Sequence, residues 1–121
     1  QFVGLTEYAG ESALTLPQGR QRLLCLAIAL ATEPQLLLLD EPITGMNAEE
    51  VETMLGIIRD VREKKGITCI IIEHNLKAVM GLCDQIAVLN FGIKIADGTP
   101  KETVENPAVI EAYVGTEEDA A

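Results

Sequence analysis

LLLLDEP, the stretch from Leu36 to Pro42, decides the fold of this 121-residue chain. Four consecutive leucines predict a strand over residues 36–40, and a run that is apolar at every position is typical of a strand buried on both faces of a sheet. A second apolar run, Cys69 to Ile72, is likewise followed by two polar residues, Glu73 and His74. Because the carboxyl ends of parallel strands meet at one edge of a sheet, these polar ends are expected to form one site.

The residues at the two strand ends carry side chains suited to hydrolytic chemistry. Asp40 is a hard oxygen ligand of the kind that binds Mg²⁺, and Glu41 is able to orient or deprotonate a water molecule. His74 is the only histidine, and its imidazole can donate a hydrogen bond to developing negative charge. Each residue also has a purely structural interpretation, as an acidic strand end before a turn at Pro42 or as an exposed histidine after a strand.

Alternating strands and helices predict an α/β fold. Pro17 is expected in the first turn of a helix that runs to Ala31, because its missing N–H is tolerated there. Asn47 and Glu50 have the spacing of a capping box, for a helix that ends before Gly66. The other expected elements are a strand over 68–73, a helix over 76–82, a strand pair over 85–89 and 93–96, and short helices that begin at 99 and 106.

This ordered series of motifs, at these spacings and over nearly the whole chain, resembles the nucleotide-binding subunits of ABC transporters. The resemblance implies the later half of a P-loop NTPase fold, with parallel strands flanked by helices. By the same resemblance, Asp40 matches the Walker B aspartate that holds Mg²⁺, and Glu41 matches the catalytic glutamate. His74 matches the switch histidine that contacts the γ-phosphate of ATP.

The segment before the first strand stands where the family has its signature motif, usually Leu-Ser-Gly-Gly-Gln. The resemblance implies that this segment contacts the ATP of the opposite subunit, and that residues 44–47 form the family's D-loop. Pro17 replaces the family's serine, which removes both a hydroxyl and an N–H. A plain helix start at residue 17 and a plain helix entry at residue 47 therefore stay open as alternatives. The implied ATP-binding residues are Pro17, Gln18, Gly19, Arg20 and Asn47.

A phosphate-binding loop of the form Gly-x-x-x-x-Gly-Lys-Ser/Thr does not occur in the sequence. The chain is therefore expected to be one partial domain over residues 1–121, from the signature helix to the carboxyl end, without the Walker A half. Either a truncated gene product or an excised piece would give such a chain. ATP and Mg²⁺ are expected to bind only together with the missing half, so the chain alone is expected to be inactive. Residues 116–121 are expected to form a disordered tail.

Composition limits the classes of partner. The net charge of −10 disfavours nucleic acid and anionic membrane surfaces. The three cysteines, Cys25, Cys69 and Cys83, lie in apolar contexts without metal-ligand spacing, so we expect buried free thiols in a reducing cytoplasm. No apolar stretch approaches the ~20 residues of a membrane-spanning helix, so separate subunits would have to cross the membrane.

The end of the chain narrows the resemblance to a subgroup of ABC transporter ATPases. Residues 73–76 and 106–115 look like those of branched-chain amino-acid importer ATPases, although lipopolysaccharide-export and urea-import ATPases have similar tails. The implied partners are a second ATPase subunit, membrane permeases and a solute-binding protein, and the implied location is the cytoplasmic face of the plasma membrane. One alternative is a non-catalytic dimerisation module derived from an ABC ATPase. A second alternative, the head of a DNA-repair ABC ATPase, is disfavoured by the short loops, the acidity and the tail.

Overall fold

The computed structural model describes residues 1–114. These residues belong to two compact units, and the boundary between the units in the sequence falls between His74 and Asn75. Each unit is described by itself. The expected disordered tail over residues 116–121 lies outside the described residues. The expectation of one partial domain over residues 1–121 stays a prediction.

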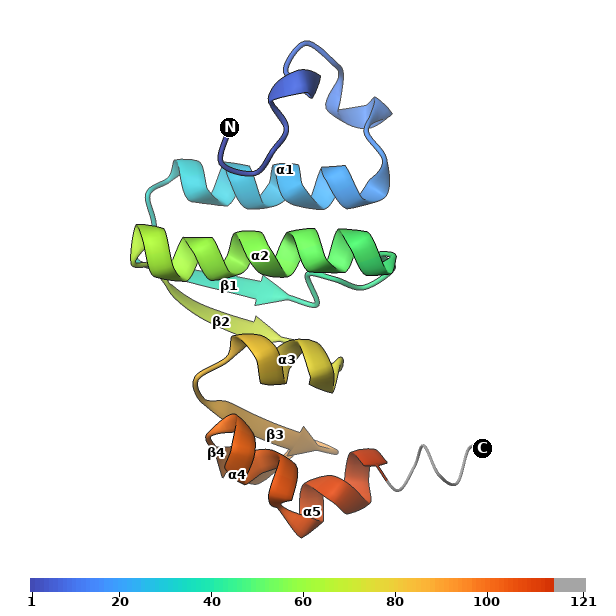
Figure 1. Cartoon of the computed structure of the whole chain (residues 1–121), viewed down its shortest axis with the longest axis vertical. Coiled ribbons are helices and arrows are strands. Elements are labelled where there is room, and N and C mark those ends of the chain that lie inside the picture. The colour runs from blue at the N-terminus through green and yellow to red at the C-terminus, as the bar shows by residue number, and fades with distance from the viewer. Residues whose placement is uncertain (115–121) are drawn as a thin grey trace. The chain divides into compact units, whose positions relative to one another are not determined.

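The first unit is an α/β arrangement in which two parallel strands carry flanking helices. β1 pairs with β2 in register, from Leu36 opposite Thr68 to Asp40 opposite Ile72. Both strands point the same way in Figure 1, and α2 connects them by running back in the opposite direction. The expected α/β class with parallel strands is confirmed. The elements are the 3₁₀ turns Thr6–Tyr8 and Ala13–Thr15, α1 (Gln18–Ala31), β1 (Leu36–Asp40), α2 (Ala48–Lys65) and β2 (Thr68–Ile72).

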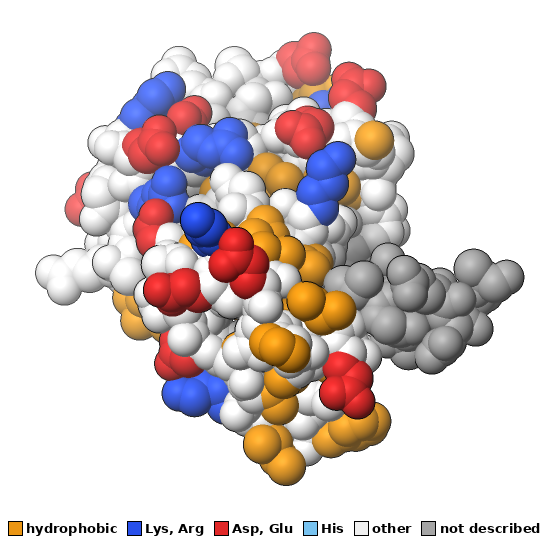
Figure 2. Space-filling model, turned by 60° about the horizontal axis from the view of Figure 1, so that its bottom comes forward, with side chains coloured by type: hydrophobic (Ala, Val, Ile, Leu, Met, Phe, Trp, Pro, Cys, Tyr) orange, Lys and Arg blue, Asp and Glu red, His pale blue; other side chains and the backbone are white. Residues whose placement is uncertain are grey.

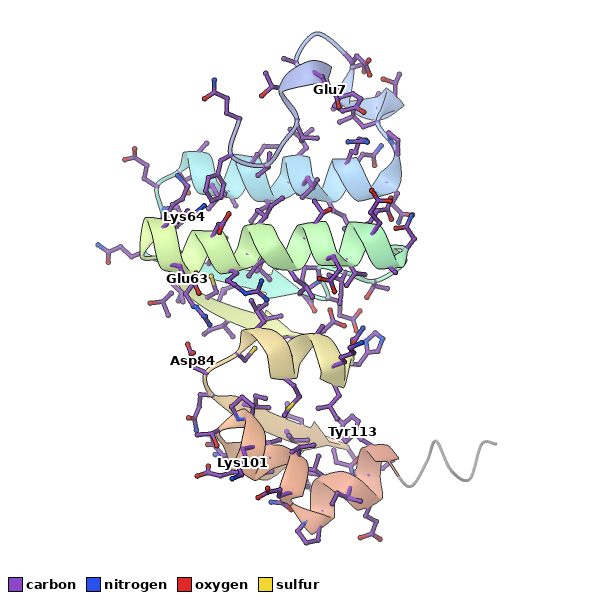
Figure 3. All side chains as sticks on the ribbon, viewed as in Figure 1. Glu7, Glu63, Lys64, Asp84, Lys101 and Tyr113 are labelled. Atoms are coloured by element: carbon purple, nitrogen blue, oxygen red, sulfur yellow. The ribbon has the colours of Figure 1, made fainter. Side chains whose placement is uncertain are left out.

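The ends of α2 follow from local chemistry. The Asn47 side chain accepts a hydrogen bond from the Glu50 N–H, and the Glu50 carboxylate accepts one from the Asn47 N–H, which completes the predicted capping box. Gly66 closes the helix with φ of 65°, a left-handed conformation that suits glycine. Basic residues fill the last turn (Lys64 is labelled in Figure 3), where they complement the negative end of the helix dipole.

The start of α1 differs by one position from the prediction. Pro17 is the N-cap and not the first helical residue, because its ψ of 152° is extended. Its side chain makes no capping hydrogen bond. The helix therefore begins at Gln18 without the side-chain acceptor that a serine would supply.

The core of the first unit lies on one face of the two strands. Leu37 is only 5% exposed, whereas Leu38, which points to the opposite face, is 68% exposed. The prediction that β1 is buried on both faces is therefore wrong for this chain. The physical reason is that no other part of the first unit covers the second face of the two strands, which also carries Leu36, Ile70 and Ile72. The buried apolar residues of this unit come from the amino-terminal segment, both helices, β1 and the turns beside the strands: Val3, Leu16, Leu23, Leu26, Leu37, Ile43, Met54, Ile58, Val61 and Ile67.

The second unit is a β-hairpin packed with short helices. β3 and β4 pair antiparallel across a two-residue turn, Phe91-Gly92, in which both residues have positive φ. Ile86, Val88 and Val109 form the buried cluster. Tyr113, labelled in Figure 3, donates a hydrogen bond to the Leu89 carbonyl at 2.8 Å. The elements are α3 (Leu76–Leu82), β3 (Ile86–Asn90), β4 (Ile93–Gly98), α4 (Pro100–Glu105), α5 (Pro107–Val109) and a π-helical turn, Ile110–Val114.

Several apolar side chains of the second unit lie at its surface. Phe91, in the hairpin turn, is 97% exposed, and its strand neighbours Leu89 and Ile93 are also exposed. Hydrophobic side chains are visible at the surface in Figure 2. Among the helices of residues 1–114, none is both long and apolar enough to cross a membrane.

Candidate functional site

The turn after β1 places Glu41 at the carboxyl ends of both strands. The Glu41 N–H donates to the Ile72 carbonyl at 2.7 Å, which extends the strand pairing by one residue. Glu41 then adopts a φ of 48°, in the left-handed region that few non-glycine residues occupy. The turn therefore brings the Glu41 side chain to the same edge of the sheet as the residues that follow β2.

Glu41 and His74 are in direct contact. His74 Nδ1 lies 3.2 Å from Glu41 Oε1 and 3.5 Å from Glu73 Oε1. The His74 side chain is 69% exposed, whereas that of Glu73 is only 3% exposed. Because an ionised carboxylate only accepts hydrogen bonds, this geometry favours the tautomer with the proton on Nδ1, which leaves Nε2 available to another group. The two strand ends thus meet as expected, while the catalytic roles of Glu41 and His74 stay predictions.

Asp40 lies beside this pair and is exposed. Its carboxylate suits Mg²⁺ in chemistry, but Mg²⁺ needs several oxygen ligands in octahedral geometry. Residues 1–114 contain no group of three or more His, Cys, Asp or Glu side chains arranged to hold a metal ion. The role of Asp40 as a Mg²⁺ ligand therefore stays a prediction, and residues 1–114 alone do not form a cation site.

The start of α1 and the start of α2 form a second candidate site. A cavity of about 290 Å³ between them is lined by Gly19, Arg20 and Asn47 among the predicted ATP-binding residues. Pro17 and Gln18 are exposed and precede it in sequence. The structure thus brings part of the predicted signature segment together with the predicted D-loop residue.

The charges of this second cavity are mixed. The Arg20 guanidinium lies over the Tyr8 ring, 4.5 Å from its centroid, which fixes one positive group at the cavity. Glu49 and Glu50 line the same cavity. The Asn47 side-chain oxygen is used to cap α2. A cavity lined by one guanidinium and two carboxylates makes a poor phosphate site in this chain alone.

Arg22 is a residue of the first site that the sequence did not reveal. Its Nη1 donates to the Glu41 carbonyl at 2.9 Å, from α1 across to the turn after β1. It also lines a cavity of about 450 Å³ together with Asp40, Glu41 and Thr44. No motif or periodicity marks Arg22, so only the tertiary structure identifies it.

The cysteines are free thiols, as expected, but not all are buried. Cys25 is exposed and lines the same cavity as Arg22, which corrects the prediction that it is buried. Cys69 and Cys83 are half-buried. Burial raises the pKa of the Cys69 thiol, and the positive charge of Arg62 offsets part of this rise.

Comparison with known proteins agrees with these motifs. The family "Branched-chain amino acid ATP-binding cassette transporter" matches residues 94–119, and the family "ABC transporter" matches residues 2–44. The branched-chain amino acid transport ATP-binding protein BraF of Pseudomonas aeruginosa is 44% identical over 113 residues. The chain is homologous to ABC transporter ATP-binding subunits. LivG of Escherichia coli, another branched-chain amino acid transport ATP-binding protein, is 42% identical over 113 residues.

The likeness to ABC transporter ATP-binding subunits covers 93% of this chain but 44% of BraF and of LivG. The chain therefore spans less than half the length of these curated relatives. Among solved structures, the ADP conformation of MJ1267, an ATP-binding cassette of an ABC transporter, superposes with a TM-score of 0.83 at 31% identity. The superposition covers 94% of this chain and 46% of MJ1267. The predicted P-loop NTPase fold of an ABC ATPase is confirmed.

Proposed function

We propose that this chain is the carboxyl-terminal part of the ATP-binding subunit of an ABC importer, with branched-chain amino acids as cargo. The contact between Glu41 and His74 at the ends of two parallel strands carries the proposal of ATP hydrolysis. The names of BraF and LivG as branched-chain amino acid transport proteins, and the family match over residues 94–119, support the choice of cargo.

In the proposed reaction Glu41 polarises or deprotonates the water that attacks the γ-phosphate. His74 steadies the Glu41 carboxylate through Nδ1–H and offers Nε2 to the phosphate. Asp40 would be one of the ligands of Mg²⁺, which offsets phosphate charge when bound. The phosphate-binding loop that such an ATPase needs would come from the remainder of the protein.

The start of α1 would contact ATP held by a second ATPase subunit. Gly19 and Arg20 line the cavity that Asn47 also reaches, and Pro17 and Gln18 precede it at the helix start. Arg20 supplies the positive charge, while Pro17 supplies no donor. Contact with the phosphate at this segment is therefore proposed to be weak.

The proposed assembly contains a second ATPase subunit, membrane permease subunits and a solute-binding protein, at the cytoplasmic face of the plasma membrane. Support comes from the transporter names of the relatives. Uptake of leucine by cells in which a hybrid subunit replaces BraF tests the cargo. The hybrid joins the amino-terminal part of BraF to this chain. Lipopolysaccharide export or urea uptake without leucine uptake would overturn the cargo proposal.

The hybrid also tests the chemistry. Glu41→Gln should lower phosphate release by about 10²–10⁴-fold while ATP binding is kept, because the proton acceptor is lost. His74→Ala should also slow turnover, whereas Glu52→Gln, at an exposed carboxylate of α2, serves as the matched control. Full activity in both site variants would show that the site is assigned wrongly. The 121-residue chain alone should release no phosphate above background, and turnover that Glu41→Gln abolishes in it would contradict the proposal.

A second candidate function is a non-catalytic dimerisation module, favoured by the carboxylates that line the cavity at the start of α1.

In the hybrid that carries Glu41→Gln, Pro17→Ser restores a hydroxyl and an N–H at the signature. A hydrogen bond to a charged group contributes roughly 1.5–3 kcal/mol, so ATP-dependent dimerisation should tighten about tenfold or more. Unchanged dimerisation would show that this segment is a structural helix start and not a phosphate contact.

A further inference from the structure

We infer that Arg22 is a positioning residue that fixes the direction of the Glu41 side chain. The inference rests on the proposed role of Glu41 in hydrolysis. Its basis is one contact: Arg22 Nη1 donates to the Glu41 carbonyl at 2.9 Å, although the two residues are far apart in sequence and lie on different elements. Arg22 reaches the peptide group that follows the Glu41 Cα, and not the carboxylate itself.

The backbone of Glu41 needs such support. Its φ of 48° is in a region that non-glycine residues seldom occupy, and such conformations persist where the surroundings hold them. The Glu41 N–H is held by the Ile72 carbonyl at 2.7 Å, and the Glu41 carbonyl is held by Arg22. Hydrogen bonds thus hold the peptide groups on both sides of the Glu41 Cα.

The Glu41 side chain has little packing of its own. It is 51% exposed, and its carboxylate contacts the imidazole of His74, which is itself exposed. For such a side chain the backbone sets the direction of the Cα–Cβ bond, and with it the region that the carboxylate can reach. The Arg22 contact therefore bears on where the carboxylate points, which is the property a general base needs.

A rival account is that Arg22 acts through its charge. It shares a cavity of about 450 Å³ with Asp40 and Glu41, so its charge also lies near both carboxylates. Arg22→Lys separates the two accounts, because lysine keeps the charge and one donor while it loses the rigid guanidinium fork. If Arg22 acts by positioning through its hydrogen bond, Arg22→Lys should restore part of the activity. The effect of Arg22→Met should then depend on the presence of the Glu41 carboxylate.

The experiment compares kcat and KM for ATP in the BraF hybrid with Arg22→Met, Arg22→Lys and Arg59→Met. Arg59 is an exposed arginine of α2 and provides the matched control. Arg22→Met should lower kcat by about 10- to 100-fold, since a small misplacement of a reacting group costs up to that much. KM should change less than twofold, and Arg22→Lys should recover part of kcat. In a Glu41→Gln background Arg22→Met should cause no further loss, because both changes remove the same function.

The outcomes separate this inference from the proposed function. Full activity of Glu41→Gln overturns the proposed role of Glu41, whereas a loss with Glu41→Gln and none with Arg22→Met overturns the positioning role alone. Hydrogen exchange of the Glu41 amide in the 121-residue chain is an independent readout that needs no activity. Arg22→Met should speed that exchange at least tenfold relative to Arg59→Met, and equal exchange in the two variants would contradict the inference even if the hybrid fails to fold.

Discussion

Gly19 and Glu50 approach so closely that a Cβ at position 19 would lie 2.9 Å from Glu50 Oε1. The Glu50 carboxylate is not free to withdraw, because it accepts a hydrogen bond from the Asn47 N–H at 3.0 Å. The absence of a side chain at Gly19 is thus linked to the capping box that starts α2. A glycine of the predicted signature segment is used here for helix packing.

This relationship predicts a coupling between positions 19 and 50. Gly19→Ala favours α1 by up to ~1 kcal/mol through helix propensity, but it pushes the Glu50 carboxylate out of the capping box. Loss of a capping interaction costs about 0.5–2 kcal/mol. Gly19→Ala should therefore stabilise the Glu50→Ala protein by more than it stabilises wild type, with a coupling free energy of about 1 kcal/mol. Urea unfolding of the four proteins measures it, and additive effects would contradict the packing argument.

Thr103 has a buried hydroxyl without a hydrogen-bond partner in the described structure. A buried, unsatisfied polar group costs about 1–3 kcal/mol, and valine has nearly the same shape as threonine. Thr103→Val should therefore raise the free energy of unfolding by about 1 kcal/mol. The matched control is Thr53→Val, because the Thr53 hydroxyl is exposed and donates to the Glu49 carbonyl. Equal changes at both positions in thermal unfolding would show that the Thr103 hydroxyl finds a partner.

Asp97 gives the β3–β4 hairpin a pH dependence. Hydrogen bonds from Gln85 and Lys94, together with the positive charge of Lys94, hold the pKa of the Asp97 carboxyl below its ordinary value. A carboxyl group whose pKa is lowered by folding stabilises the folded state above its unfolded pKa, and this contribution is lost as the pH falls through the folded value. Wild type should therefore be more stable than Asp97→Asn at neutral pH, and the difference should shrink below about pH 4.

The Asp97 prediction is checked by urea unfolding of both proteins across the acidic range. In a Lys94→Met background the destabilisation caused by Asp97→Asn should be smaller at neutral pH, because one hydrogen bond and the attraction to Lys94 are absent. A stability difference that stays constant from neutral pH to pH 2 would rule out the linkage.

The cysteines should differ in reactivity. Cys25 is exposed on α1, whereas Cys69 is half-buried and its pKa is raised by burial. Since the thiolate is the reactive form, an aromatic disulfide reagent at about pH 8 should modify Cys25 faster than Cys69. Cys25→Ser should remove the fast phase, and Cys69→Ser should leave it in place. A fast phase that survives Cys25→Ser would contradict the exposure of Cys25.

Local chemistry predicted most element boundaries. β1 and α3 have the bounds expected from the sequence, and both ends of α2 follow from Asn47 and Gly66. These features depend on residues within a few positions of each other, so the sequence displays them directly. The meeting of Glu41 and His74 was also predictable, because parallel strands bring their carboxyl ends together.

Features that depend on distant parts of the chain were not predictable. The exposure of Leu38 follows from what covers a face of the sheet, and four leucines in a row do not report that. The Arg22 contact joins a helix to a turn after the following strand, and an arginine among the polar residues that begin α1 has no spacing that indicates its partner. The exposed position of Cys25 likewise depends on how α1 is rotated about its axis.

The leucine run has a consequence for how β1 finds its place beside β2. Leu36 to Leu39 are identical, so a slip of one residue would exchange leucine for leucine on both faces and change little apolar contact. Asp40 breaks this degeneracy, because a slipped strand would carry its carboxylate toward the apolar interior. The bond from the Glu41 N–H to the Ile72 carbonyl fixes the same alignment. The polar residues proposed for chemistry therefore also determine the register in which β1 pairs with β2 during folding.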